Sequence, residues 1–264
     1  HSFGNHGTAL PLKVGARTKP ERPWISKKAS KRLKKDASRN LRENNTKHFW
    51  HAITMISLIS GGQYAVFLLL LVALLLSLSF HEYGHAIVAK FEGDNTAQQL
   101  GRLTINPIKH IDPSGLIMVI LIGIGYAKPV PVDPRQFRST FSYLKVALAG
   151  PGMNLLLAIV SWNFFLLLKG QGIENDGMDL FFILFAQINL LLMTFNLIPL
   201  GPLDGHYVLP YFLPRKLSYQ YRVLNERYGL WALLILLVLT YSLLPLEHYM
   251  GSYTMWLLEA ISWV

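Results

Sequence analysis

The chain has 264 residues, of which 52% are hydrophobic and only 15% are charged. A soluble domain carries about 25% charged residues, so this composition excludes an ordinary soluble protein. The sequence contains no cysteine, which excludes disulfides, thiolate metal sites and cysteine nucleophiles. Any metal site must therefore be built from histidine and carboxylate side chains.

The net charge of +10 comes from the N-terminal segment. Residues 1–48 hold 13 Lys or Arg against three acidic residues, whereas residues 49–264 hold 12 of each sign. We predict a basic, disordered extension over 1–48 and a membrane-embedded domain over 49–264; a residual targeting segment is the alternative. Lysine pairs in the extension could contact anionic lipid head groups. No nucleic-acid partner is expected, because aromatic residues do not interleave with the basic ones. The start at His1 instead of Met is typical of a fragment or a processed form.

The first half of the domain contains one long apolar run and several short ones. Residues 49–62 end at a glycine pair and predict an interfacial or re-entrant helix. Residues 63–89 predict the first long helix, with about the 20 apolar residues that a membrane-spanning helix needs. Apolar and polar residues alternate over 99–106, which predicts a short strand. Residues 116–127 are too few to span, so we expect them to dip into the membrane or pack in the core.

The second half predicts four more helices. Two long ones are expected over residues 143–168, with Gly-Pro-Gly near the start, and over residues 178–197. A third covers residues 229–244, and the short apolar stretch 253–264 predicts an interfacial or partial helix. The expected fold is therefore an all-α polytopic membrane protein. It has about four to six transmembrane or re-entrant helices and a small β element between the first two long ones.

The loop charges predict the orientation of these helices. Residues 90–145 hold seven Lys or Arg and four acidic residues, and the connection after residue 197 holds four basic and two acidic residues. The loop between the helices at 143–168 and 178–197 has one lysine and three acidic residues. Because cytoplasmic loops are enriched in Lys and Arg, the first two loops are expected on the cytoplasmic side of a prokaryotic cell membrane.

The central motif is His-Glu-Tyr-Gly-His at residues 81–85, near the cytoplasmic end of the first long helix. Histidines at i and i+4 lie on one helical face and can bind a single Zn²⁺. The intervening Glu82 can take a proton from a water that the metal activates. The alternative is a buried histidine pair without a metal, but ionisable residues at the end of an apolar helix favour a functional role.

A catalytic zinc takes a third protein ligand and keeps one position open. Asp204 is the best candidate. The helices over 63–89 and 178–197 run in the same direction, so the second delivers Asp204 at the depth of His81 and His85. Asp-Gly alone would predict a turn, but the prolines and glycines around it indicate irregular backbone, which survives at membrane depth where it lines a site.

Three motifs together resemble a known family. HEYGH at 81–85, AGPGMN at 149–154 and NLIPLGPLDG at 196–205 are similar, in the same order, to the signatures of the site-2 protease family of intramembrane zinc metalloproteases. Residues 101–113 and 127–133 resemble its compact bacterial branch, which lacks a PDZ domain. The resemblance covers residues 63–264 and does not extend to the basic extension.

The resemblance implies one Zn²⁺ per chain, held by His81, His85 and Asp204, with Glu82 as general base and then general acid. It also implies that Asn154 positions or polarises the substrate carbonyl. From the residues alone, an amide after Gly-Pro-Gly is equally consistent with a helix cap. The implied activity is hydrolysis of peptide bonds in or next to transmembrane helices of substrate proteins, in regulated proteolysis or membrane-protein turnover.

Three more polar residues are candidates for substrate positioning. Asn196 lies at the end of the helix predicted before Asp204, His206 follows Asp204 by two residues, and His110 lies in the loop after the predicted strand. Each is also consistent with a structural role. The predicted strand at 99–106 could pair with an extended substrate.

Other functional classes fit the pattern less well. A metal transporter would spread its ligands along a path, whereas these candidates lie at one depth. A di-iron oxidase or desaturase needs several histidine-rich boxes, and this chain has one. A non-catalytic regulator would lack Glu82 or a ligand, and all of them are present.

Overall fold

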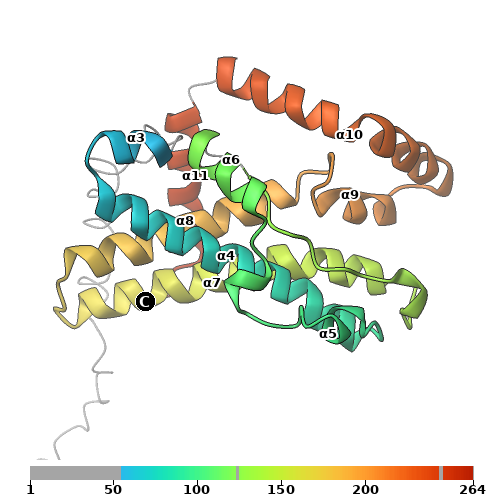
Figure 1. Ribbon diagram of the computed structural model, residues 1–264, viewed down its shortest axis with the longest axis horizontal. Helices are drawn as coiled ribbons and strands as arrows, with labels where there is room; N and C mark the ends of the chain where they lie inside the picture. Colours follow the sequence, from blue (N-terminus) through green and yellow to red (C-terminus); the bar gives the residue numbers. More distant parts are fainter. Residues whose placement is uncertain (1–54, 123–124, 244–245, 264) are drawn as a thin grey trace, which may run out of the picture.

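The computed structural model describes residues 55–122, 125–243 and 246–263 (Figure 1). The predicted basic extension and the start of the 49–62 helix lie outside these residues. In chain order the elements are α3 (Met55–Ser60), α4 (Tyr64–Phe91), α5 (Thr96–Gln99), η2 (Pro107–Lys109), α6 (Pro113–Ile122), η3 (Pro134–Gln136), α7 (Ser142–Gly170), α8 (Asp176–Asn196), α9 (Gly205–Val208), η4 (Leu209–Phe212), α10 (Arg215–Leu243) and α11 (Leu246–Ala260).

Three of the described helices, α4, α7 and α8, are long and apolar enough to cross a membrane. All three were predicted, and their observed bounds lie within a few residues of the expected ones. They pack against one another as the central bundle (Figure 1). The other helices are shorter or partly polar, so a count above three spans stays a prediction.

A glycine allows α4 and α7 to approach closely. A Cβ at Gly84 would lie 2.7 Å from the carbonyl oxygen of Ala149 and 3.1 Å from the Cβ of Met153. Because any side chain at residue 84 would push the helices apart, the glycine of the HEYGH motif brings α7 against His81 and His85. The opposite end of the bundle is closed by the turn to α8, which Asn175 caps by accepting a hydrogen bond from the Met178 N–H at 3.0 Å.

The predicted strand over residues 99–106 is wrong. Residue 99 ends α5, and residues 100–106 form turns and irregular chain. The Arg102 N–H donates locally to the Ala97 carbonyl at 2.8 Å, and none of the described residues forms a strand that could pair with this segment. Leu103 packs on a cluster of Ala86, Ala97 and Val130, which accounts for the apolar member of the alternating pattern without a sheet.

The apolar run predicted to dip into the membrane is the short helix α6. It packs on α3 beside α4, and Asp112 caps it by accepting hydrogen bonds from the N–H groups of Ser114 and Gly115 at 2.9 and 3.1 Å. A Cβ at Gly115 would overlap the backbone of Tyr126. The first turn of α6 therefore packs backbone to backbone against the segment that follows the helix. The whole connection from α4 to α7 contains only α5, η2, α6 and η3 among its described residues, and no PDZ domain.

The C-terminal helices begin earlier than predicted. The helix expected over 229–244 is the apolar second half of α10, which starts at Arg215, and the stretch expected from 253 belongs to α11, which starts at Leu246. The chain after α11 is attached to α7. The Trp162 Nε1–H donates to the Ser262 Oγ at 2.7 Å, and the Asn163 side chain bonds the backbone of Ile261 and Trp263.

Candidate metal centre

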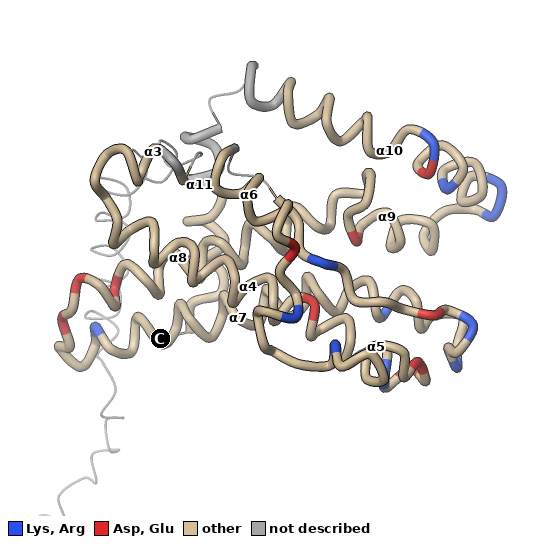
Figure 2. Tube along the Cα trace, viewed as in Figure 1, with Lys and Arg blue, Asp and Glu red and all other residues tan. Residues whose placement is uncertain are grey.

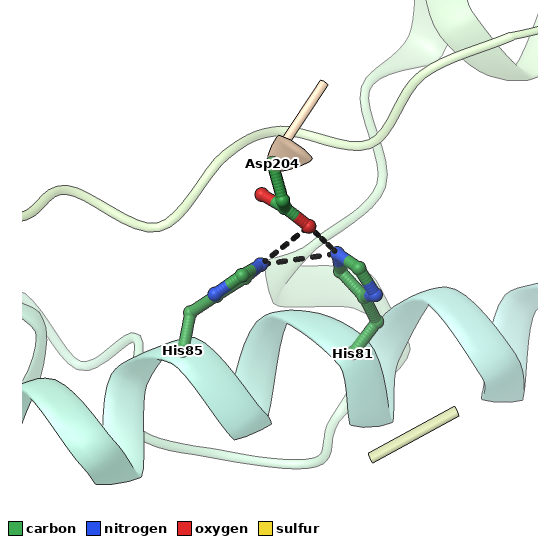
Figure 3. Close-up of side chains that lie close together, drawn as sticks. All are labelled: His81, His85 and Asp204. Carbon is green, nitrogen blue, oxygen red and sulfur yellow. Dashed lines mark hydrogen bonds and ion pairs between the residues drawn. The ribbon is translucent and has the colours of Figure 1, made fainter. Parts of the chain in front are cut away.

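Two histidines of α4 present ring nitrogens to one point. His81 and His85 are one helical turn apart and are 5% and 9% exposed, and their Nε2 atoms lie 3.0 Å from each other. The Oδ2 atom of Asp204 lies 3.2 Å from the first nitrogen and 3.4 Å from the second (Figure 3). The structure therefore brings the three predicted ligands together.

A chain of side-chain amides determines which His81 nitrogen carries the proton. Asn189 of α8 donates through Nδ2 to the Phe185 carbonyl at 2.8 Å, so its Oδ1 accepts from the Nδ2 of Asn154 at 2.8 Å. The Oδ1 of Asn154 then faces the Nδ1 of His81 at 2.6 Å. Because an amide oxygen only accepts, Nδ1 of His81 is the donor. In the neutral ring, Nε2 is left with a free lone pair.

His85 reaches the same state through the backbone of α7. Its Nδ1 lies 2.7 Å from the carbonyl oxygen of Val146, which can only accept. In the neutral ring, its Nε2 therefore also presents a lone pair. Two nitrogen lone pairs and a carboxylate oxygen that no described residue hydrogen-bonds converge within 3.4 Å. With both rings neutral, such an arrangement is repulsive unless a cation lies between the three atoms.

The spacing of these atoms fits zinc. A tetrahedral ion with bonds of 2.0–2.1 Å has its ligand atoms about 3.3–3.4 Å apart, and the three distances here are 3.0, 3.2 and 3.4 Å. Space for the site comes from Gly150 of α7. A Cβ there would overlap the Nε2 of His85 and lie 2.6 Å from the Nε2 of His81. The donor set, its spacing and this glycine together fit a three-ligand zinc site.

Asp204 is positioned by a loop that α10 holds. Asn225 of α10 accepts a hydrogen bond from the Gly201 N–H at 3.1 Å and donates to the Gly201 carbonyl at 3.3 Å. Gly201 has a φ of 61°, a left-handed conformation that favours glycine. Tyr221 also donates to the Pro199 carbonyl at 2.8 Å. These contacts connect the first half of α10 to the loop that carries the predicted third ligand.

Glu82 lies beside the ligands but is not one of the three converging groups. It is 8% exposed, and its Oε2 accepts a hydrogen bond from the Val130 N–H at 2.8 Å. The chain before Val130 is itself held in place. The Lys128 N–H donates to the His110 carbonyl at 2.8 Å, and Arg102 donates to the Lys128 carbonyl at 2.7 Å. Glu82 is thus oriented by residues 128–130, which are themselves held in place by hydrogen bonds.

The other predicted candidates lie outside the ligand cluster. His110 is 1% exposed and its Nε2 donates to the Thr104 carbonyl at 2.7 Å, so it braces the loop before α6. Asn196 donates back to the Leu192 carbonyl at 2.9 Å within α8. His206 bonds the Leu203 carbonyl at 2.6 Å, and burial lowers the pKa of its imidazole, although that bond and the charge of Asp204 oppose the shift. Their predicted roles with substrate stay predictions.

Sequence reasoning missed Asn189, Gly150 and Asn225. Asn189 did carry a signal, because an amide in the middle of an apolar spanning helix is expensive unless it is bonded. Gly150 belonged to a motif that was recognised, but its contact with the histidines depends on the packing of α4 on α7. Nothing in the sequence pairs Asn225 with Gly201.

The amide chain leads to a prediction about zinc affinity. Asn189→Leu removes the acceptor that orients Asn154, and we expect the zinc dissociation constant to rise about 10–100-fold, as for other groups that orient a metal-binding histidine. Competition with a chromophoric chelator measures it. Asn163→Leu is the matched control, since Asn163 is also buried, at 4% exposure against 0% for Asn189, but bonds the chain after α11. Equal zinc affinities for the two variants would contradict the role of Asn189.

Comparisons with known proteins show the family of the chain. The sequence profile of Peptidase family M50 matches residues 69–176. The chain is 39% identical over 193 residues to the "Putative zinc metalloprotease YwhC" of Bacillus subtilis, an alignment that covers 71% of this chain and 84% of that protein.

More distant relatives carry similar names. The chain is 32% identical over 149 residues to the "Putative zinc metalloprotease Rip2" of Mycolicibacterium smegmatis, covering 54% of this chain and 57% of that protein. It is 28% identical over 152 residues to the "Zinc metalloprotease MJ0392" of Methanocaldococcus jannaschii, covering 57% and 36%. No solved structure matches the chain.

Proposed function

Since the chain belongs to peptidase family M50, the site-2 proteases, and is a zinc metalloprotease, we propose that it hydrolyses peptide bonds in or next to transmembrane helices of substrate proteins. The observation that carries the proposal is the position of the ligand cluster. His81 and His85 lie within α4, a helix long and apolar enough to span a membrane. A metal held here lies within the helix bundle, so the peptide bonds that can approach it are those of membrane proteins.

The side chains around the site divide the reaction between them. His81, His85 and Asp204 would hold a zinc ion, which when bound supplies a Lewis acid that polarises a carbonyl and makes water more acidic. Glu82 takes a proton from the attacking water, whose oxygen adds to the carbonyl carbon. The C–N bond then breaks, and Glu82 returns the proton to the leaving nitrogen. Asn154 is proposed to act through His81, which its Oδ1 contacts at 2.6 Å.

Charge supports an active site near the cytoplasmic face. Lys and Arg gather at the end of the bundle that carries α5 and the first turns of α10, and acidic residues gather at the turn between α7 and α8 (Figure 2). By the positive-inside rule the first end faces the cytoplasm. The loop that carries Asp204 is joined to the first half of α10 through Gly201, which favours placing the metal centre toward this end of a prokaryotic cell membrane, in contact with lipid on its outer surfaces.

The test uses full-length protein in detergent with a panel of single-span substrates. We expect cleavage to stop when zinc is removed by a chelator and to return when zinc is added back. The activity of Asp204→Ala should not return when zinc is added, because this variant lacks one of the three proposed ligands. Its zinc affinity should fall by more than the roughly 10–100-fold expected for loss of a residue that only orients a ligand. Zinc per chain is measured in parallel. Full metal content and activity in Asp204→Ala would exclude Asp204 as a ligand.

Substrate helices should be cut faster where they open easily. A continuous helix holds each carbonyl in an i to i−4 hydrogen bond, and Gly and Pro lower the cost of opening by about 1 and 3 kcal/mol relative to Ala. If opening limits the reaction, the rate should rise about tenfold or more with Gly or Pro near the scissile bond. Mass spectrometry maps the cuts in a series with Ala, Leu, Gly or Pro at successive positions. Equal rates across the series would contradict the need for opening, and cuts at the outer end would contradict the orientation.

A further inference from the structure

A small cavity lies between α4 and the segment that contains α6, and its lining on α4 ends one helical turn before Glu82. Its volume is about 20 Å³, and most of its lining is apolar, although Ser79, His110, Asp112 and Tyr126 also contribute to it. Leu74 and Leu78 of α4 form one wall, and Leu116, Val119 and Ala127 contribute to the other. None of these residues takes part in binding the metal, and the reaction described above gives the cavity no function.

Each wall of the cavity contains a residue that is close along the chain to Glu82 or to Val130, its hydrogen-bond partner. Leu78 precedes Glu82 by four residues on α4, so the two side chains are neighbours on one helical face with Cβ atoms about 5–6 Å apart. Ala127 precedes Val130 by three residues, and the Val130 N–H bonds the Glu82 carboxylate at 2.8 Å. The cavity therefore begins within one helical turn of the proposed general base.

We propose that this cavity is a subsite for a small side chain of the substrate, one or two residues from the scissile bond. The inference rests on the proposed function. An extended peptide advances about 3.3 Å per residue, so a substrate whose scissile carbonyl lies beside Glu82 brings the side chain of an adjacent residue to the cavity.

The size and lining of the cavity define the preferred side chain. A volume of about 20 Å³ holds one water-sized or methyl-sized group, so the alanine methyl fits and the side chains of leucine and phenylalanine do not. The Ser79 hydroxyl already donates to the Leu75 carbonyl at 2.6 Å, and the His110 Nε2 to the Thr104 carbonyl at 2.7 Å. Asp112 and Tyr126 also line the cavity, and their carboxylate and hydroxyl groups can accept a hydrogen bond from a serine hydroxyl. Alanine and serine are therefore both expected to be preferred over leucine and phenylalanine.

The experiment enlarges the cavity and asks whether the substrate preference follows. One single-span substrate carries Gly, Ala, Ser, Val, Leu or Phe at each of three positions on either side of its mapped cleavage site. Wild-type protein, Leu116→Ala and Leu121→Ala are compared by kcat/KM. Leu121 is the matched control, because it is a leucine of the same helix but is 50% exposed and does not line the cavity. Leu78→Phe, which fills the cavity, provides a second test.

At one position we expect wild-type protein to cut the Ala substrate at least about tenfold faster than the Leu substrate, within the range by which apolar pockets discriminate. Leu116→Ala should reduce or reverse that ratio, and Leu121→Ala should not. Leu78→Phe should slow the Ala substrate relative to the Gly substrate. The subsite is excluded if Leu116→Ala and Leu121→Ala both keep the wild-type substrate profile at every position, which is the result expected if only a water occupies the cavity. It is also excluded if the two variants change the profile equally. Absence of zinc-dependent cleavage of every substrate by wild-type protein would instead remove the proposed function and the subsite with it.

Discussion

Glu82→Gln should lower kcat/KM for peptide hydrolysis by about 10²–10⁴-fold, the usual contribution of a general base, while zinc per chain stays at the wild-type level. Glutamine cannot take the proton from the attacking water. Its amide oxygen can still accept the hydrogen bond that the Val130 N–H now donates to Glu82 at 2.8 Å, so the extended segment beside it should remain in place. The metal should also remain, because Glu82 is outside the group of converging ligand atoms.

The control for this charge change is Glu226→Gln on the exposed face of α10, which should leave both activity and zinc unchanged. Zinc content by atomic absorption and activity on the single-span substrate are measured on the same preparations. Glu82 would have a structural role instead if its variant lost zinc as His81→Ala does. Activity within a few-fold of wild type would exclude it as the base.

Gly150→Ala should eliminate most activity and weaken zinc binding, although it adds a single methyl group. The new Cβ would overlap the Nε2 of His85 and lie 2.6 Å from the Nε2 of His81, so one or both rings must move by roughly 1 Å. A misplacement of that size can cost about 10²-fold in rate. The imidazoles cannot swing away freely, because each Nδ1 is held by a hydrogen bond of 2.6–2.7 Å.

Gly152→Ala is a closely matched control, since a Cβ there would meet no atom within 4 Å. Both positions lie in α7, where alanine is intrinsically more favourable than glycine by roughly 0.5–1 kcal/mol. Neither variant should therefore unfold, and thermal denaturation checks this. The contact between Gly150 and the histidines would be refuted if the two variants kept the same zinc affinity and the same kcat/KM.

The polar groups around the candidate metal site form one connected arrangement across the three candidate membrane-spanning helices. Ser77 of α4, Asn154 of α7 and Asn189 of α8 are joined by hydrogen bonds of 2.8–3.3 Å, and the Ser77 hydroxyl donates back to the Ala73 carbonyl at 2.7 Å. Buried polar groups are costly unless they are bonded. The arrangement therefore helps to set the register of the helices as well as the direction of the His81 ring.

The sequence by itself determined the features that depend on neighbouring residues. The lengths of the apolar runs predicted α4, α7 and α8, because crossing a membrane is a requirement on consecutive residues. The HEYGH spacing placed both histidines on one helical face, because a turn of α-helix has the same geometry in any protein. Asp204 could also be predicted from the sequence, since the loop charges predicted that α4 and α8 run in the same direction and end on the same side.

Only the tertiary structure decided the features that depend on a partner far along the chain. The alternating residues 99–106 satisfy the local rule for a strand, but a strand exists only where another pairs with it, and here Leu103 packs on a cluster from other elements. The contact of Gly150 with the histidines, the amide chain from Asn189 and the hold of Asn225 on Gly201 likewise join residues from separate helices. Which buried polar atoms meet is decided by how the helices pack, because a hydrogen bond requires two atoms within about 3 Å, and local sequence does not specify that distance.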